Sequence, residues 1–503
     1  MNDSSRNKRI AKNTITLYIR MGITMLISFF TTRITLEVLG VEDYGLNNVI
    51  ASVVSMFGFI NGSMGTAVQR FFSVEIGRKN REKLSSVFGV GLYLHVIIAF
   101  ITLLIAEVFA FFFLSKLNIP PDRLFAAHIV FQITILSLCA TIVNVPFAAI
   151  LRAHEEFSKI AIFDIVQSLL RLAVLFLLFK IDYDKIVVLS ILNLGVSLSY
   201  VIGITFLAYK YDEVSFKFVR DKELIKDMVS FVSVLVFTVL AGVVNKQGLV
   251  IVVNLFFGLT VNAAYGIAYQ VSRILETFAM NFKQSVVPQL MEAQSSSNSF
   301  RMNKLIFSGT KISFLLMLLI SIPIIFEADF LLDLWLKKPP EYTSIFVKLI
   351  VVSVNINTFY YFIYQAVHAS GKIKNQQIFI SLSYFFSIII LYFIFKLGGE
   401  YYFVVIVPII FSFIRNVIVL YFANRTISFP LKKYMQEVVF PCFLLSILIL
   451  LAMLAPFNLL EESFLRLFVS SFISVFSTLI GGYFIVLNSV EREKILGFFK
   501  TIK

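Results

Sequence analysis

About fourteen apolar stretches, each long enough to cross a lipid bilayer, follow one another from Asn13 to Asn488. The polar segments between them are too short to fold as separate domains. Apolar residues make up 58% of the 503 residues, and charged residues only 15%. A soluble fold of this length could not bury so much apolar surface. The sequence therefore predicts an all-α polytopic membrane protein.

Each apolar stretch is taken as one membrane-spanning helix. Several stretches exceed the roughly 20 residues that cross the hydrocarbon, so those helices are expected to tilt or to protrude. The basic segment Met1–Lys12 is followed by a long apolar run without a cleavage site, which indicates an uncleaved first helix. The predicted spans are 13–39, 46–76, 84–114, 123–150, 160–180, 186–209, 227–256, 263–287, 305–330, 345–369, 377–395, 401–422, 435–455 and 464–487.

The Lys and Arg residues, which give the chain a net charge of +14, are divided unevenly between the connections. Arg78–Lys83 and Lys210–Lys226 are rich in them, whereas the turns at Gly40–Gly45 and Phe257–Asn262 contain none. Because loops with Lys and Arg are retained on the cytoplasmic side, both termini are expected in the cytoplasm. A nucleic-acid partner would need these charges on one folded face, so none is predicted.

Two of the turns resemble each other and indicate an internal repeat. The first contains Gly40 followed by Tyr44-Gly45, and the second contains Gly258 followed by Tyr265-Gly266. Because the turns are six predicted spans apart, the chain divides into two six-helix halves, an arrangement typical of transporters with a site between the halves. The predicted parts are an N-terminal lobe at 1–209, a cytoplasmic connector at 210–226, a C-terminal lobe at 227–422, and an extra helix pair with a cytoplasmic tail at 423–503.

The segment LEVLGVEDYGLNNVIASVVSMFGFINGSMGTAVQRFFSVEIG, Leu36 to Gly77, resembles the first hairpin of bacterial polysaccharide exporters, the Wzx-type O-antigen flippases. The segment NLFFGLTVNAAYGIAYQV, Asn254 to Val271, resembles the hairpin that opens their second half. Helix count, loop lengths and inside termini agree along essentially the whole chain. These exporters belong to the multidrug, oligosaccharidyl-lipid and polysaccharide exporter superfamily. The resemblance implies a MATE-like pair of six-helix lobes around a central cavity, and a polyprenyl-pyrophosphate-linked oligosaccharide moved from the cytoplasmic to the periplasmic leaflet.

Charges inside the predicted spans are the candidates for substrate contact. A charge at bilayer depth costs about 2.5–3.5 kcal/mol and usually faces a water-filled cavity or a partner. Cations dominate in this chain, and they suit a diphosphate because arginine binds phosphate oxygens with a two-pronged fork and lysine binds them as a point charge. The candidate substrate-binding residues are Arg33, Lys246, Arg273, Arg70, Arg171 and Arg415.

Structural roles are also compatible with several span charges. Arg20 lies near the cytoplasmic end of the first span, where its side chain could snorkel to the headgroups. Arg273 and Glu276 have the spacing of an intrahelical ion pair. Asp164 and Arg171, two turns apart, could neutralise each other. The sequence leaves these alternatives open.

Two carboxylates, Glu107 and Glu276, are the candidates for ion coupling, because most other carboxylates lie near the ends of spans. The four histidines form no pair at ligand spacing, and Cys139 and Cys442 both fall inside spans. No nucleophile elbow, phosphate-binding glycine loop or metal signature is present. The sequence therefore predicts no cofactor, no metal and no enzymatic activity.

The predicted function is export of a lipid-linked oligosaccharide across the bacterial inner membrane, by alternating access, for O-antigen or capsule biosynthesis. Membrane lipids and other polysaccharide-assembly proteins are the expected partners. The related peptidoglycan-precursor flippase has two arginines part-way down its second helix with no counterpart near Met56–Phe59, so its substrate is not transferred. One alternative is a multidrug-type cation antiporter, which would need carboxylates in its cavity. Another is a membrane glycan polymerase or acyltransferase, which would need a catalytic loop or an intramembrane His/Asp arrangement.

Overall fold

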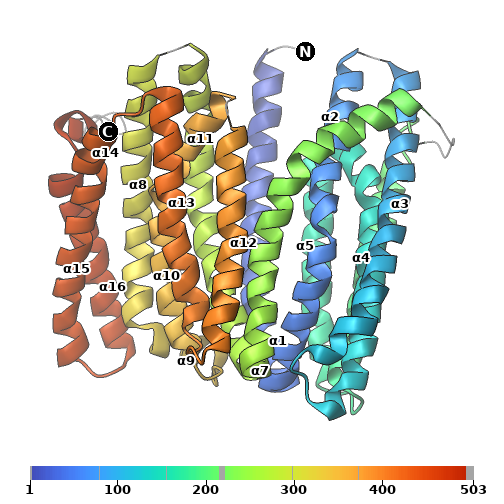
Figure 1. Cartoon of the computed structure of the whole chain (residues 1–503), viewed down its shortest axis with the longest axis horizontal. Coiled ribbons are helices and arrows are strands. Elements are labelled where there is room, and N and C mark those ends of the chain that lie inside the picture. Colours follow the sequence, from blue (N-terminus) through green and yellow to red (C-terminus); the bar gives the residue numbers. More distant parts are fainter. Residues whose placement is uncertain are drawn as a thin grey trace. The chain divides into compact units, whose positions relative to one another are not determined.

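The computed structural model describes residues 3–78, 80–154, 156–214, 221–296, 298–371 and 373–493. This part of the chain is helical and contains no strand, and twelve of its helices are long and apolar enough to cross a membrane. The chain forms two compact units, Met1–Ala263 and Ala264–Lys503 (Figure 1). Parts of the predicted connector and tail, at 215–220 and 494–503, lie outside the described residues.

The first unit is built from six helices, two short 3₁₀ turns and the beginning of a seventh helix (Figure 1). One apolar core lies where α1, α3, α4, α6 and α7 meet, near the turns that contain no Lys or Arg. The elements are α1 (Asp3–Phe57), α2 (Phe59–Arg78), α3 (Arg81–Phe113), η1 (Leu114–Lys116), η2 (Pro121–Arg123), α4 (Leu124–Ala153), α5 (Phe157–Leu178), α6 (Lys185–Ala208) and α7 (Lys222–Ser295).

Two of these helices are broken at a glycine that lies within a predicted turn. Gly40 in α1 has φ 77° and ψ 175°, and Gly258 in α7 has φ 76° and ψ −163°. This backbone region is essentially restricted to glycine, so one residue is enough to redirect each helix. Each kinked helix contains two of the predicted spans, one on either side of its glycine, so twelve continuous apolar helices account for the fourteen predicted spans.

The two kinked helices touch each other beside their kinks. A Cβ atom built on Gly45 would lie 2.2 Å from the carbonyl oxygen of Leu259, so only glycine allows this approach. The side chain of Asn254 accepts a hydrogen bond from the Asn118 N–H and donates one to the Asn118 carbonyl, at 3.0 and 3.2 Å. Both kinks therefore lie at the same end of the first unit, as the repeat requires. The half-turn rotation between the two six-helix halves stays a prediction.

Arg123 joins three elements at this end of the first unit. Its guanidinium donates to Asp43 beside the α1 kink, and to Asp184, the N-cap residue of α6, at 2.8 Å. One arginine fork satisfied by two carboxylates fixes the orientation of all three groups.

The second unit contains the end of α7 and the helices that follow it (Figure 1). Helix α8 begins at a cap formed by Asn298, whose side chain accepts a hydrogen bond from the Arg301 N–H. The elements are α8 (Ser299–Phe326), α9 (Ala328–Leu336), α10 (Thr343–Thr358), α11 (Tyr361–Ala369), α12 (Lys374–Lys396), α13 (Phe403–Ile427), α14 (Leu431–Tyr434), η3 (Met435–Val439), α15 (Phe440–Leu459), α16 (Phe464–Gly481) and η4 (Gly482–Val486).

Two buried ion pairs fasten the C-terminal helix pair to α8. At one end, Arg466 of α16 donates to Glu327, the C-cap residue of α8, at 3.0 Å, and their side chains are 6% and 1% exposed. At the other end, Lys311 of α8 donates to Glu491 at 3.0 Å, with 2% and 9% exposure. Buried charges of this kind are tolerated only when they are paired.

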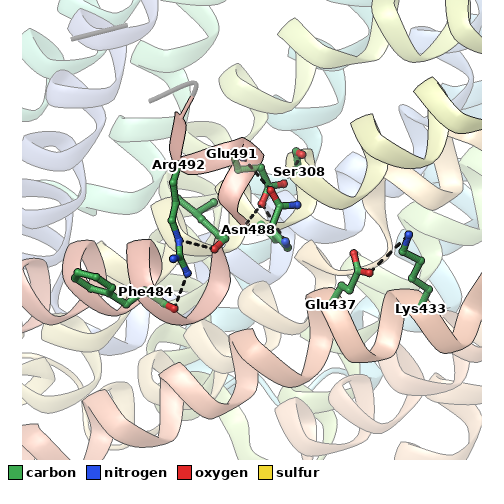
Figure 2. Close-up of polar contacts among 9 residues, drawn as sticks. Ser308, Lys433, Glu437, Phe484, Asn488, Glu491 and Arg492 are labelled. Atoms are coloured by element: carbon green, nitrogen blue, oxygen red, sulfur yellow. Dashed lines mark hydrogen bonds and ion pairs between the residues drawn. The ribbon is translucent and has the colours of Figure 1, made fainter. Parts of the chain in front are cut away.

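The segment after η4 is held in place by further polar contacts (Figure 2). Glu491 accepts hydrogen bonds from Ser308 and from the Asn488 N–H, while Asn488 accepts one from the Glu491 N–H. This reciprocal arrangement is a capping box that starts a new helical turn. Arg492 donates to the carbonyls of Phe484 and Leu487, which satisfies the C-terminal end of η4.

Candidate functional site

The span charges fall into a group with carboxylate partners and a group without them. Arg20 of α1 donates to Asp164 of α5 at 2.7 Å, and Tyr200 of α6 donates to the other oxygen of Asp164 at 3.1 Å. Asp164 thus pairs with Arg20, and the alternative in which it neutralises Arg171 does not hold in the structure. Arg20 is held within the protein by this pair.

Arg33 and Arg171, also in the first unit, have no hydrogen bond or ion pair with any described residue. Arg33 is half-buried on α1, between Thr32 and Thr35, which are both buried. Arg171 is exposed on α5, one turn before the buried residue Val174. Both cations lie within helices long enough to span a membrane. They are therefore available to an anionic ligand.

Lys246 and Arg70 are exposed on the first-unit part of α7 and on α2, respectively, and each makes contacts with its surroundings. Lys246 follows the buried residue Asn245, so the polar stretch predicted around it divides between a buried and an exposed face of α7.

The two candidate carboxylates for ion coupling are both exposed. Glu107 of α3 accepts a hydrogen bond from Gln132 of α4 at 3.0 Å. Glu276 of α7 accepts one from Ser272 at 3.3 Å. Arg273 is also exposed on α7, and it forms no ion pair with Glu276, so the intrahelical pair allowed by their spacing is not made.

Arg415 is the most deeply placed of the candidate cations. It is 7% exposed on α13, donates to Ser412 at 2.7 Å, and lies over the ring of Tyr384 at 4.5 Å from the ring centroid. Its Nε and Nη1 atoms are buried and have no hydrogen-bond partner among the described residues. The guanidinium thus keeps two donor nitrogens, with three N–H groups, that no described residue uses.

Arg415 belongs to a group of polar and aromatic side chains within the second unit. Tyr360, Tyr364 and Tyr384 pack against the same apolar core, which contains Phe362 and Val419. Tyr364 of α11 accepts a hydrogen bond from Gln377 of α12 at 2.7 Å, and its ring lies 4.2 Å from that of His368. Gln377 Nε2 also lies 2.5 Å from His368 Nε2. The name tyrosine–arginine cluster is used below for Tyr360, Tyr364, His368, Gln377, Tyr384 and Arg415.

Three further buried cations were not predicted from the sequence. Lys283 of α7 is 8% exposed and lies over the ring of Tyr361 at 4.9 Å from its centroid, and Lys311 and Arg466 have the carboxylate partners described above. All three lie inside predicted spans, so an inventory of every charge in those spans would have found them. Which of them has a partner depends on packing between distant segments, which the sequence does not reveal.

An apolar pocket of about 660 Å³ lies within the second unit, between α8, α10, α13 and α15. Phe314, Ile356, Phe413 and Leu450 are among the residues that line it, and its few polar contributors include Ser321, Asn355, Asn416 and Ser446. Its size and composition suit an alkyl or isoprenoid chain. Among the described residues, no group of three or more His, Cys, Asp and Glu side chains could hold a metal ion.

Comparison with known proteins gives both a family and a fold. A family model described as polysaccharide biosynthesis protein matches residues 10–294, more than half of the chain. The uncharacterized membrane protein EpsK of Bacillus subtilis (strain 168) is 27% identical over 164 residues, which are 33% of this chain and 32% of EpsK. The match therefore spans about a third of the length of that relative.

Two solved structures share the fold along most of the chain. The lipid II flippase MurJ, in an inward closed conformation, has a TM-score of 0.71 at 17% identity and covers 93% of this chain and 98% of its own. An inward-facing multidrug resistance MATE family transporter of the MOP superfamily has a TM-score of 0.65 at 13% identity and covers 82% and 98%. Because the sequence identities are low, these two comparisons show that the fold is shared and do not show a shared function.

Proposed function

Because the chain belongs to the family of polysaccharide biosynthesis proteins and has a fold shared by flippases and multidrug transporters, we propose that it is a flippase for a lipid-linked oligosaccharide. The cargo is a saccharide joined through a diphosphate to a polyprenyl chain. Transport runs from the cytoplasmic to the periplasmic leaflet of the inner membrane and supplies surface polysaccharide. The proposed mechanism is alternating access, without a chemical reaction on the cargo.

One observation carries this proposal: cations without carboxylate partners lie within membrane-spanning helices. Arg33 and Arg171 have no ion pair with a described residue, whereas Arg20, Lys311 and Arg466 do. Keeping an unpaired cation at this depth is costly, so it is expected to have a function. A diphosphate, with about two negative charges, supplies the missing anions.

The chemistry of the second unit supports a lipid carrier for this anion. The apolar pocket between α8, α10, α13 and α15 has the volume and composition for part of a hydrocarbon chain. A multidrug-type cation antiporter remains the second candidate, and Glu107 and Glu276 are the exposed carboxylates that would serve it. Cations dominate the charges inside the predicted spans, and this excess favours the anionic cargo.

The orientation follows from the positions of Lys and Arg in the sequence. The connections around Arg78–Arg81 and Lys210–Lys226 are expected in the cytoplasm together with both termini. The kinks at Gly40 and Gly258 are then on the periplasmic side. Cysteine labelling of each end in intact cells tests this orientation.

Depletion of the protein tests the function. Lipid-linked glycan is expected to accumulate on the cytoplasmic leaflet, where a membrane-impermeant lectin or glycosidase reaches it only in inverted vesicles. Reconstitution of the purified protein into liposomes is the matching test, because it should restore movement of the extracted lipid-linked glycan across the bilayer. Normal glycan distribution after depletion, with cation efflux lost instead, would establish the antiporter.

A further inference from the structure

The tyrosine–arginine cluster combines side chains that suit a polyhydroxylated ligand. Tyr360, Tyr364 and Tyr384 supply aromatic faces and hydroxyl groups, and Gln377 supplies an amide that both donates and accepts. Tyr364, His368, Gln377 and Tyr384 are all half-buried, so their edges are accessible within the second unit. Their positions are fixed by the Gln377 to Tyr364 hydrogen bond and by ring contacts.

Several polar atoms of this cluster have no partner. The Oε1 atom of Gln377 and the Nε and Nη1 atoms of Arg415 are buried without a hydrogen bond to any described residue. Leaving such atoms unsatisfied is unfavourable, so a polar group is expected to complete them at some stage of the transport cycle. The free atoms include two donors and one acceptor, the combination that sugar hydroxyl groups can satisfy, since each hydroxyl both donates and accepts.

The charge of the cluster favours a neutral group over the diphosphate. Arg415 is its one permanent cation, and that guanidinium already lies against Tyr384 and Ser412. One guanidinium does not balance the roughly two negative charges of a diphosphate. Arg33 and Arg171 of the first unit supply two guanidinium groups without a described partner, so they suit the charged part of the cargo better.

We propose that the tyrosine–arginine cluster binds a sugar residue of the cargo, with Gln377 and Arg415 bonding its hydroxyl groups and the tyrosine rings packing against its apolar face. This inference rests on the proposed function and assigns the recognition of the glycan to the second unit. A site that bonds a hydroxyl discriminates against a ligand that lacks it, because its own polar groups are then left unpaired. The cluster therefore favours a glycosylated lipid over the bare lipid diphosphate.

The test compares two probes in proteoliposomes: polyprenyl diphosphate carrying one N-acetylhexosamine, and bare polyprenyl diphosphate. Gln377→Leu is expected to raise the half-saturating concentration of the glycosylated probe about five- to tenfold, the effect of losing one or two hydrogen bonds, and to leave the bare probe unchanged. Tyr364→Phe, which keeps the ring, is expected to act in the same direction more weakly. Asn375→Leu is the matched control, because Asn375 is exposed on the same helix and lies outside the cluster.

Each outcome decides the proposal. The sugar site is supported if Gln377→Leu raises the half-saturating concentration of the glycosylated probe alone and Asn375→Leu behaves like the wild type. If transport of both probes is weakened equally, Gln377 only maintains the fold. If the Gln377→Leu protein transports both probes like the wild type, the cluster does not touch the cargo. Either result overturns the sugar site but not the proposed flippase function. A wild-type protein that moves neither probe overturns the proposed function and this inference with it.

Discussion

Arg20 and Arg33 lie on the same helix, yet only Arg20 has a carboxylate partner. Arg20 is neutralised by Asp164, which Tyr200 also contacts, and its role is to hold α1, α5 and α6 together. Arg33 is half-buried with no such partner. The difference separates a cation that is neutralised within the fold from one that the proposed function assigns to the cargo.

We therefore expect opposite effects from the two alanine substitutions. Arg33→Ala should keep normal abundance in the membrane, because it removes an unpaired charge, but should abolish export of the lipid-linked glycan. Arg33→Lys should restore export in part, because a point charge lacks the two-pronged contact with phosphate. Arg20→Ala should instead lower abundance, since Asp164 is left without its partner. Surface polysaccharide per unit of inserted protein is the measurement, and full export by Arg33→Ala would exclude Arg33 from the cargo site.

The carboxylates Glu107 and Glu276 give a second prediction at this scale. Each accepts a hydrogen bond that a glutamine can also accept, from Gln132 or Ser272. Glu107→Gln and Glu276→Gln are therefore expected to reduce transport less than Arg33→Ala does. The same export assay checks this order. Complete loss of surface glycan in either variant, at normal protein level, would indicate ion coupling through that carboxylate.

The sequence revealed the candidate cations but not their partners. Spacing suggested that Arg171 neutralises Asp164, whereas the structure pairs Asp164 with Arg20, 144 positions away in the sequence. Contacts of that separation depend on how helices pack, and helical spacing along one segment carries no information about them. Glu327 illustrates the same limit, because it lies at the end of a span, where a carboxylate is common, yet it is buried against Arg466.

At the scale of the helix, the kinks of α1 and α7 depend on three glycines with two different requirements. Gly40 and Gly258 need their backbone conformation, so alanine at either position is expected to cost about 1–3 kcal/mol. Gly45 has an ordinary helical backbone but touches the main chain of Leu259, so Gly45→Ala must push two helices apart. Gly45→Ala should therefore lower the stability of the protein more than Gly40→Ala does.

Thermal unfolding in detergent measures this order. Gly22→Ala in α1 is the matched control, because no atom lies within 4 Å of the added methyl group and alanine has the higher helix propensity. It should be neutral or slightly stabilising. A Gly45→Ala protein as stable as the wild type would show that the close approach of α1 and α7 is not essential to the first unit.

The attachment of α16 to α8 gives a prediction with a pH dependence. Burial raises the pKa of Glu491, but the hydrogen bonds from Ser308 and Asn488 and the charge of Lys311 outweigh it, so the pKa lies below its ordinary value of 4.5. Because the pKa is lowered in the folded state, the pair stabilises the protein fully above pH 4.5. This contribution decreases as the pH falls from there through the folded-state pKa.

Glu491→Gln should therefore destabilise the protein by about 3 kcal/mol at neutral pH, because Lys311 stays buried without its partner. The difference from the wild type should shrink below pH 4.5. The double variant Lys311→Met/Glu491→Leu should recover most of the loss, since it leaves no unpaired buried charge. Melting curves of the three proteins across this pH range provide the measurement, and a pH-independent difference would contradict the assigned pair.

At the scale of the whole molecule, the sequence predicted the helical membrane fold and the family, and the structure and comparisons confirm both. Long apolar runs leave few alternatives, because a bilayer requires every backbone group to be bonded within its own helix. The short polar turns at Gly40 and Gly258 indicated breaks, and the structure has a break at each glycine, made by one residue without a loop. The equivalence of the two six-helix halves stays a prediction, and a structure with the two turns on opposite membrane faces would refute it.

Helix α7 also determines when the first unit can be completed during synthesis. The first unit extends to Ala263, and Met228, Val232 and Asn254 of α7 all contribute to its packing. The ribosome must therefore release the first half of α7 before the six preceding helices have their full set of contacts. Nascent chains arrested after residue 214 should be cut readily by protease, whereas chains arrested well after residue 296 should contain a resistant first unit. A membrane insertase or chaperone that holds unfinished helices is expected to act on this protein during the interval between those two lengths.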